Sequence, residues 1–200
     1  MPHLLYSPAS PYSAKVRMAV AWLGLDIDNK IVNTSVEPPD LVDNNPLGKI
    51  PTLVLNDGAA LFDSRAIMQE LDRMSGKRLF PRNAEKRREA EKLEALADGI
   101  CDCLLAQIYE KRFRPEEKVH QPWLDLQARK AERGLDWLEE NAPRVTVKLH
   151  GGQFAMAAMF GYLDLRFEEL NWRRGRPKLR RFEQRFAARF DQYERLKPGA

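Results

Sequence analysis

Cysteine and histidine are scarce in this chain: two cysteines and three histidines occur among its 200 residues. Cys101 and Cys103 lie two positions apart in a predicted helix, which turns their side chains to different faces and argues against a disulfide between them. His3, His120 and His150 show neither an HExxH spacing nor any link to the cysteines, so we expect no metal site. Two unpaired thiols are typical of a protein in the reducing cytosol.

Long apolar runs and a secretory leader are also missing. The longest nearly unbroken apolar stretch covers residues 154–163, whereas about 20 apolar residues are needed to cross a bilayer. Residues 1–6 carry no basic region ahead of a long apolar segment, so they do not resemble a signal peptide. We therefore expect a cytoplasmic protein with no membrane partner.

Neither sign of charge dominates. The 33 Lys and Arg residues are interspersed with 29 Asp and Glu residues, which gives a formal net charge of +4 and a pI near 9.1. Residues 172–181 form one basic cluster that contains Trp172, a composition that also occurs in nucleic-acid-binding proteins. Leu179, Phe182 and Phe186 recur at helical spacing, however, which favours a surface helix with solvated arginines. We expect no nucleic-acid partner.

The first half of the chain begins with a strand, a helix and a second strand. Residues 3–6 are typical of a short buried strand, and residues 11–23 of a helix that Gly24 ends at its C′ position. The residue pattern over 27–32 predicts a second strand. The Pro-, Asp- and Asn-bearing stretch over 38–46 predicts a loop with room for one helical turn.

A hairpin and a further helix follow. Residues 52–55 and 60–62 flank Asn56-Asp57-Gly58, whose residues tolerate the positive φ of a tight turn. From Ser64 onward, apolar residues recur at helical spacing until Gly76 offers a stop. The predicted order is therefore βαβ followed by ββα.

Beyond residue 84 the sequence becomes charge-rich and helical, with no repeat and no low-complexity tract. Helical periodicity extends past residue 104 and resumes in three further segments, over 121–140, 152–168 and 177–195. The sequence thus predicts an α/β domain over residues 1–77, a linker over 78–84 and an all-α domain over 85–200.

Ser10-Pro11 marks the N-terminus of the first helix, because serine is a common N-cap and proline is preorganised for the first helical position. Free amides and the helix dipole at such an end stabilise an anion, and a hydrogen bond to a charged group contributes about 1.5–3 kcal/mol. That corresponds to about one to two pKa units for a bound thiol. Taken alone, Ser10 is better explained as a simple cap, so a catalytic role depends on two further motifs.

The first of these motifs is Asn45-Pro46-Leu47-Gly48-Lys49-Ile50-Pro51, directly before a strand. A cis Ile50-Pro51 bond would hold an unpaired backbone edge open. The amide and carbonyl of Ile50 would then pair with an extended peptide, with Lys49 near its terminal carboxylate. An ordinary turn with a trans proline is the alternative and the commoner arrangement.

The second motif is Asp63-Ser64, at the start of the following helix. Ser64 and the local amides suit a carboxylate, while Asp63 suits an ammonium group, so this end of the site fits a zwitterion. Capping of the helix is again the simpler alternative.

Three segments resemble the N-terminal signatures of bacterial glutathione S-transferases, in order and spacing: Tyr6 to Arg17 (YSPASPYSAKVR), Asn45 to Leu55 (NPLGKIPTLVL) and Phe62 to Leu71 (FDSRAIMQEL). Glu94 to Gly99 (EALADG) and Gly161 to Phe167 (GYLDLRF) resemble the family's helical domain. The resemblance spans nearly the whole chain. It implies an α/β thioredoxin-like N-terminal domain followed by an all-helical bundle, glutathione as co-substrate, no metal, and a homodimer.

The resemblance also implies a role for each candidate residue. Ser10 is the catalytic residue and contacts the glutathione sulfur. Ile50 pairs with the cysteinyl backbone and Pro51 is cis, while Lys49 meets the glycyl carboxylate. Asp63 and Ser64 hold the γ-glutamyl end. The second substrate, a small hydrophobic electrophile, lies between the loops of the first domain and the helix over roughly residues 84–112.

Some members of the family carry a cysteine where this chain has Ser10, and that cysteine forms mixed disulfides with glutathione. A hydroxyl stabilises a thiolate but cannot become its disulfide partner, so the serine favours conjugation over thiol transfer. Tyr6 and Ser7 are rival activators, and Ser10 is preferred because it alone precedes the helix-starting proline. A non-catalytic glutathione-binding protein and a glutathione-dependent peroxidase or reductase are the alternative functions.

His150-Gly151-Gly152-Gln153 departs from the Ser/Thr-x-x-Asp capping box that the family commonly shows before its core helix. Loss of an N-cap hydroxyl costs about 1 kcal/mol, and glycine adds backbone entropy. We therefore expect a looser start of this helix, with half of the box retained by Gln153.

Overall fold

The computed structural model describes residues 1–199. Its N-terminal half contains a four-stranded sheet in the order β2-β1-β3-β4. The strands are β1 (His3–Tyr6), β2 (Asp28–Ile31), β3 (Thr52–Val54) and β4 (Ala60–Leu61). β1 pairs with β2 in parallel, while β1 with β3 and β3 with β4 are antiparallel. The predicted βαβ-ββα order is confirmed.

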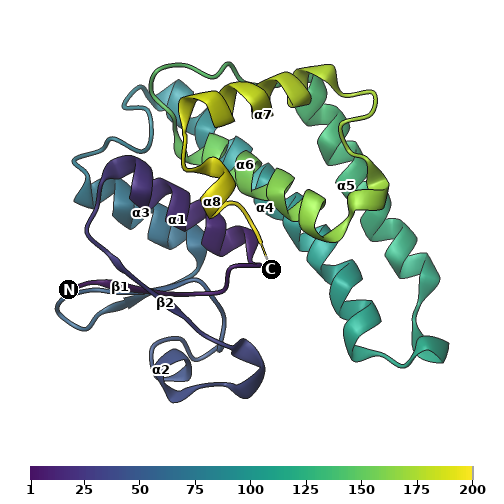
Figure 1. The fold of residues 1–200 in the computed structure, drawn as a ribbon, viewed down its shortest axis with the longest axis horizontal. Coiled ribbons are helices and arrows are strands. Elements are labelled where there is room, and N and C mark those ends of the chain that lie inside the picture. The colour runs from purple at the N-terminus through teal and green to yellow at the C-terminus, as the bar shows by residue number, and fades with distance from the viewer. Residues whose placement is uncertain (200) are drawn as a thin grey trace.

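Helices cover both faces of this sheet (Figure 1). α1 (Pro11–Leu23) has the predicted bounds and ends at Gly24, whose φ of 64° lies in the left-handed region that glycine tolerates. α3 (Ser64–Met74) packs beside α1 on the same face. A 3-10 turn (Thr34–Val36) and the short α2 (Pro39–Val42) follow β2, and α2 lies on the opposite face.

Between residues 84 and 199 the structure contains only helices and the segments that connect them, so the all-α prediction is confirmed. The helices are α4 (Ala84–Phe113), α5 (Gln121–Glu140), α6 (Gly151–Arg166), α7 (Pro177–Arg189) and α8 (Tyr193–Leu196), with 3-10 turns at Glu116–Lys118 and Glu168–Leu170. The prediction of one continuous helix over 177–195 is wrong. Phe190 leaves the helical conformation and its ring packs against Trp22 and Phe154, which breaks the segment into α7 and α8.

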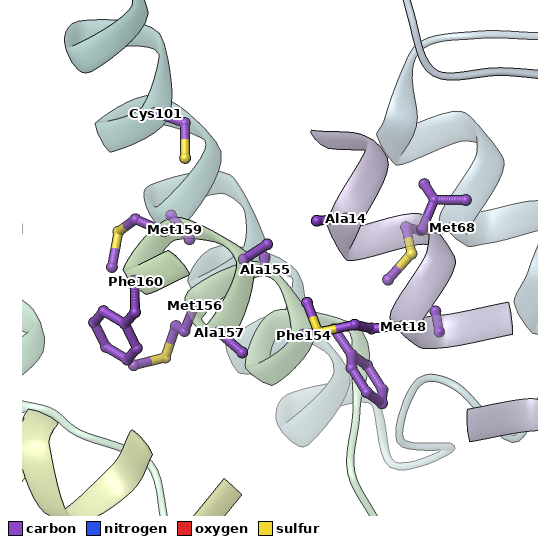
Figure 2. Packing of buried hydrophobic residues seen from close by; sticks show 14 of the residues in the cluster. Ala14, Met18, Met68, Cys101, Phe154, Ala155, Met156, Ala157, Met159 and Phe160 are labelled. Atoms are coloured by element: carbon purple, nitrogen blue, oxygen red, sulfur yellow. The ribbon is translucent and has the colours of Figure 1, made fainter. Parts of the chain in front are cut away.

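α6 forms the centre of the core, and every residue from Gly151 to Leu163 is buried. Figure 2 shows it between Ala14 and Met18 of α1 on one side and Cys101 of α4 on the other. A single cluster of buried apolar side chains includes residues of both halves of the chain. The core therefore does not stop at the predicted linker.

Two glycines allow close packing at the start of α6. A Cβ atom on Gly151 would lie 2.4 Å from the Phe80 ring, and Gly152 lets α6 approach α4. A Cβ atom on Gly152 would lie 2.3 Å from the backbone oxygen of Ala90, a distance that no real Cβ contact shows. Gly151 and Gly152 are both buried, and the looser helix start stays a prediction. The Gln153 side chain does accept from the His150 backbone N–H over 3.1 Å, so half of the capping box is retained.

None of the helices within residues 1–199 combines the length and the apolar composition that crossing a bilayer requires.

Candidate functional site

A cleft of about 500 Å³ opens between the loops of the N-terminal half and the helices α4 and α6. Its lining includes the β1–α1 loop, the turn before β3, the start of α3, one face of α4 and the end of α6. All six predicted site residues line it: Ser10, Lys49, Ile50, Pro51, Asp63 and Ser64. Ser10 and Ser64, which are 54 positions apart in the sequence, thus lie on one cavity.

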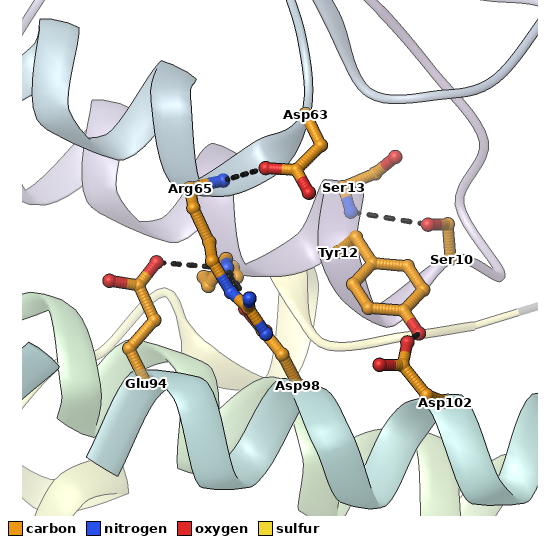
Figure 3. A network of polar contacts seen from close by, with 9 residues as sticks. Ser10, Tyr12, Ser13, Asp63, Arg65, Glu94, Asp98 and Asp102 are labelled. Carbon is orange, nitrogen blue, oxygen red and sulfur yellow. Dashed lines mark hydrogen bonds and ion pairs between the residues drawn. The ribbon is translucent and has the colours of Figure 1, made fainter. Parts of the chain in front are cut away.

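Ser10 caps α1 and points its hydroxyl at the cleft. Its Oγ accepts from the Ser13 backbone N–H over 3.2 Å, which leaves the hydroxyl hydrogen available for a ligand. Figure 3 shows this bond at the end of the helix. The Ser10 backbone N–H donates to the Ser7 oxygen over 3.1 Å, which fixes the loop. Ser7 also lines the cleft, whereas Tyr6 is buried in the core and does not.

The turn before β3 presents an unpaired backbone edge. The Ile50-Pro51 bond is cis, as the family resemblance implies. Strand pairing starts only at Thr52, so Ile50 takes no part in it. The side chains of Asn45 and Thr52 both donate to the Lys49 backbone oxygen, over 2.8 and 2.9 Å, and hold the turn in shape.

Asp63 and Ser64 form the start of α3 on the same side of the cleft. The Asp63 Oδ1 accepts from the Arg65 backbone N–H over 2.9 Å, as an N-cap does. No residue within 1–199 bonds to the Asp63 Oδ2, which therefore stays available for a ligand cation. Ser64 is 3% exposed and lies at the first helical position.

A buried ion cluster that the sequence reasoning missed joins the two halves behind this wall (Figure 3). Lys15 of α1 is fully buried, and its Nζ lies 2.9 Å from a Glu94 oxygen and 2.9 Å from Asp98 Oδ2. Arg65 of α3 donates to the same Asp98 oxygen over 2.9 Å. Burial lowers the pKa of Lys15, but the Asp98 and Glu94 carboxylates outweigh it and raise that pKa overall. Lys15 is thus held charged.

Tyr12 and Asp102 form a second polar pair in the cleft. The Tyr12 hydroxyl donates to an Asp102 carboxylate oxygen. Burial, and then the surrounding negative charges, raise the pKa of Tyr12 far above its ordinary value, so the phenol stays protonated. A sequence signal for both clusters did exist: Glu94, Asp98 and Asp102 recur at every fourth position and share one face of α4.

The remaining lining is apolar and aromatic, with two cations. Leu105, Ile108 and Tyr109 of α4 face Tyr162 of α6 across this part of the cleft, and the cations are Arg112 and Arg166. Burial raises the pKa of Tyr162 to about 12. This composition suits a second substrate with apolar surface.

Neither cysteine lines the cleft. Cys101 is buried, and its burial raises the pKa of its thiol well above the ordinary range, while burial also raises the pKa of the half-buried Cys103. Both thiols are therefore poor nucleophiles. Among residues 1–199 no three His, Cys, Asp or Glu side chains are grouped so that they would hold a metal ion.

Much of the basic cluster over 172–181 has a structural role. Trp172 is buried and stacks on Phe160, with ring centroids 4.2 Å apart. Arg173 pairs with Asp164 and Glu183, and Arg176 pairs with Glu132 and Asp136, at distances between 2.5 and 2.7 Å. These contacts tie α5, α6 and α7 together, so the expectation of solvated arginines is wrong for these two.

Comparisons with known proteins identify the same two halves. Residues 9–74 match the family described as Glutathione S-transferase, N-terminal domain, and residues 121–185 match Glutathione S-transferase, C-terminal domain. The uncharacterized GST-like protein YibF of Escherichia coli K12 is 32% identical over 185 residues, which cover 88% of this chain and 89% of YibF.

Solved structures agree over the full length. A glutathione S-transferase from Methylobacillus flagellatus KT with glutathione bound is 34% identical and matches with a TM-score of 0.91 over 100% of both chains. A glutathione transferase family member from Pseudomonas fluorescens Pf-5 with bound glutathione is 32% identical, with a TM-score of 0.89 over 100% of both chains. The latter protein also has a structure with bound S-(propanoic acid)-glutathione. This chain therefore belongs to the glutathione S-transferase family.

Proposed function

We propose that this protein binds glutathione in the cleft, lowers the pKa of its thiol and transfers the thiolate to a small electrophile with apolar surface. The observation that carries the proposal is the convergence of Ser10, the cis Ile50-Pro51 turn and Asp63-Ser64 on one cavity with an apolar outer part. Glutathione-bound relatives with the same fold support the choice of ligand.

Each end of the tripeptide has a matching group in the cleft. The glycyl carboxylate binds the Lys49 ammonium, and the free edge at Ile50 pairs with the cysteinyl backbone as an added strand. The γ-glutamyl carboxylate binds Ser64 and the free amides at the start of α3, while Asp63 Oδ2 accepts from the ammonium. The sulfur then lies near the start of α1.

Ser10 activates the sulfur. Its hydroxyl donates to the thiolate, and the dipole of α1 adds to the stabilisation of the negative charge. The thiolate attacks the electrophilic carbon held against α4 and α6, and the leaving group departs with the bonding electron pair. A redox role through an enzyme cysteine has no support, because both thiols lie outside the cleft.

Titration of the bound thiol tests this proposal directly. The ultraviolet absorbance of the thiolate is followed against pH for glutathione bound to saturating protein and for free glutathione. We expect the pKa of the bound thiol to be lower by about one to two units. A bound thiol that ionises like the free one contradicts activation, and no binding at all contradicts the function as a whole.

From the family resemblance we further propose that the protein is a homodimer in the cytoplasm. We also propose two domains, residues 1–77 and 85–200, joined by a linker over 78–84. Sedimentation equilibrium measures the oligomeric state. A mass of one chain across micromolar concentrations contradicts the homodimer.

A further inference from the structure

Two arginines at the outer part of the cleft lack partners. Arg112 of α4 and Arg166 of α6 both line the cavity, and neither forms an ion pair or a hydrogen bond with any residue in 1–199. Nearby arginines behave differently: Arg114, two residues beyond Arg112, pairs with Glu110 over 2.8 Å. The two unpaired guanidinium groups thus face an open cavity from two different helices.

Three acidic residues line the cleft: Asp98 and Asp102 lie on α4 well before Arg112 and are already engaged, while Asp63 lies at the start of α3 with its Oδ2 available. Asp98 is paired with Lys15 and Arg65, and Asp102 accepts from the Tyr12 hydroxyl. Arg112 lies about 15 Å further along the axis of α4 than Asp102, and helical side chains lean back toward the N-terminus, which brings its guanidinium inward. The outer part of the cleft is therefore locally positive.

Tyr162 lines the same cleft as the two arginines. Burial raises the pKa of its hydroxyl to about 12, and the positive charges of Arg166 and Arg112 oppose that rise. Tyr109 lies beside them on α4, with the Arg112 guanidinium carbon 5.8 Å from its ring centroid.

We propose that Arg112 and Arg166 bind the carboxylate of the second substrate, so that this enzyme prefers electrophiles that pair an apolar ring or chain with an acidic group. The proposal rests on the proposed function, because it assigns the substrate class of the same cleft. Planar guanidinium groups match a carboxylate with two parallel hydrogen bonds. With an aryl chloride, the thiolate sulfur bonds to the ring carbon and chloride leaves with the electron pair, while the ring carboxylate stays on the arginines.

Binding of two matched glutathione conjugates tests the proposal without turnover. The probes are S-(4-carboxybenzyl)glutathione and S-(4-methylbenzyl)glutathione, measured by calorimetry at low and high salt. We expect the wild-type protein to bind the carboxylate at least tenfold more tightly than the methyl compound at low salt, with a smaller preference at high salt. The Arg112→Gln/Arg166→Gln variant should lose the preference and still bind glutathione normally.

Lys111→Gln/Lys118→Gln is the matched control, because it removes the same charge from exposed positions at the same end of the molecule that do not line the cleft. It should keep the preference. Equal binding of the two conjugates by the wild-type protein overturns the proposal, as does a preference that survives the loss of both arginines or disappears equally in the control.

Turnover measurements distinguish the carboxylate site from the glutathione conjugation on which it rests. The enzymatic rates with 4-chloro-3,5-dinitrobenzoate and with its methyl ester are each divided by the uncatalysed rate and then compared. Turnover of both with no preference for the acid contradicts the carboxylate site alone. A binding preference for the carboxylate conjugate without turnover of either compound contradicts conjugation and leaves the anion site standing.

Discussion

Lys15 donates to both carboxylate oxygens of Asp98, over 3.0 and 2.9 Å, across the contact between α1 and α4. The lysine follows Ser10 by little more than one helical turn. Its partner stands on the helix that supplies one wall of the cleft. The bond therefore fixes the end of α1 that carries Ser10 relative to the face of α4 that lines the cleft.

Lys15→Met should destabilise the protein by about 3–5 kcal/mol, because it leaves the buried Glu94 and Asp98 charges without their main partner. Urea denaturation measures the loss. Lys30→Met is the control: its ion pair with Asp40 is exposed, and its removal should leave the denaturation midpoint almost unchanged. Equal losses of stability in the two variants would show that the buried ion pairs of Lys15 stabilise the fold no more than the exposed pair of Lys30.

Ser10→Ala should lower kcat/KM for a chlorodinitrobenzene about 10- to 100-fold, which corresponds to the loss of one hydrogen bond to a charged sulfur. Glutathione affinity should change little, because in the proposed binding mode Lys49, Ile50, Asp63 and Ser64 hold the rest of the tripeptide. Ser7→Ala, in the same loop and cleft, should keep most of the activity. The opposite order of the two variants would assign activation to Ser7.

Gly152→Ala should destabilise the fold by about 1–3 kcal/mol, because the new methyl group would lie 2.3 Å from the Ala90 backbone oxygen and 2.9 Å from the Leu93 Cβ. Gly99→Ala serves as the comparison within α4. No atom lies within 4 Å of a Cβ at Gly99, so alanine should stabilise the helix there by about 0.5–1 kcal/mol. Thermal unfolding measures both, and the same sign for both would refute the packing argument.

His150→Thr should raise the melting temperature, and the gain should be larger at pH 5 than at pH 7.5. Burial lowers the pKa of His150 from 6.5 to about 4, and its Nδ1 has no partner within residues 1–199. Between pH 6.5 and about pH 4, His150 binds a proton in the unfolded chain but not in the folded one. Folding stability therefore falls as the pH drops through this range. The upper limit of that loss is about 3 kcal/mol.

Threonine removes this titration and restores an N-cap hydroxyl. A gain that does not depend on pH would leave only the cap effect. An unchanged or lower melting temperature at both pH values would contradict the prediction for the cap as well.

The N-terminal half was predictable because its signals are local. Ser10-Pro11 and Gly24 define both ends of α1, and Asn56-Asp57-Gly58 defines the hairpin turn. Such residues act on their own backbone, so no knowledge of tertiary contacts is required. The six site residues were named from the family resemblance of their motifs, and all six line the cleft.

Features set by distant contacts were not predictable in this way. α7 ends early because Phe190 packs against Trp22, which lies more than 160 positions away. The glycines at 151 and 152 suggested a loose helix start, and the sequence did not show that Phe80 packs against the first and α4 against the second. Lys15 resembles any other helix lysine until α4 brings Glu94 and Asp98 against it.

The position of α6 has a consequence for how the molecule comes apart. Since α6 packs against α1 and α4 together, removing the all-helical half would leave the apolar side of α1 in water. We expect calorimetry to record one melting transition for the chain rather than two. A fragment ending at residue 77 would then be prone to aggregate instead of behaving as an independent module.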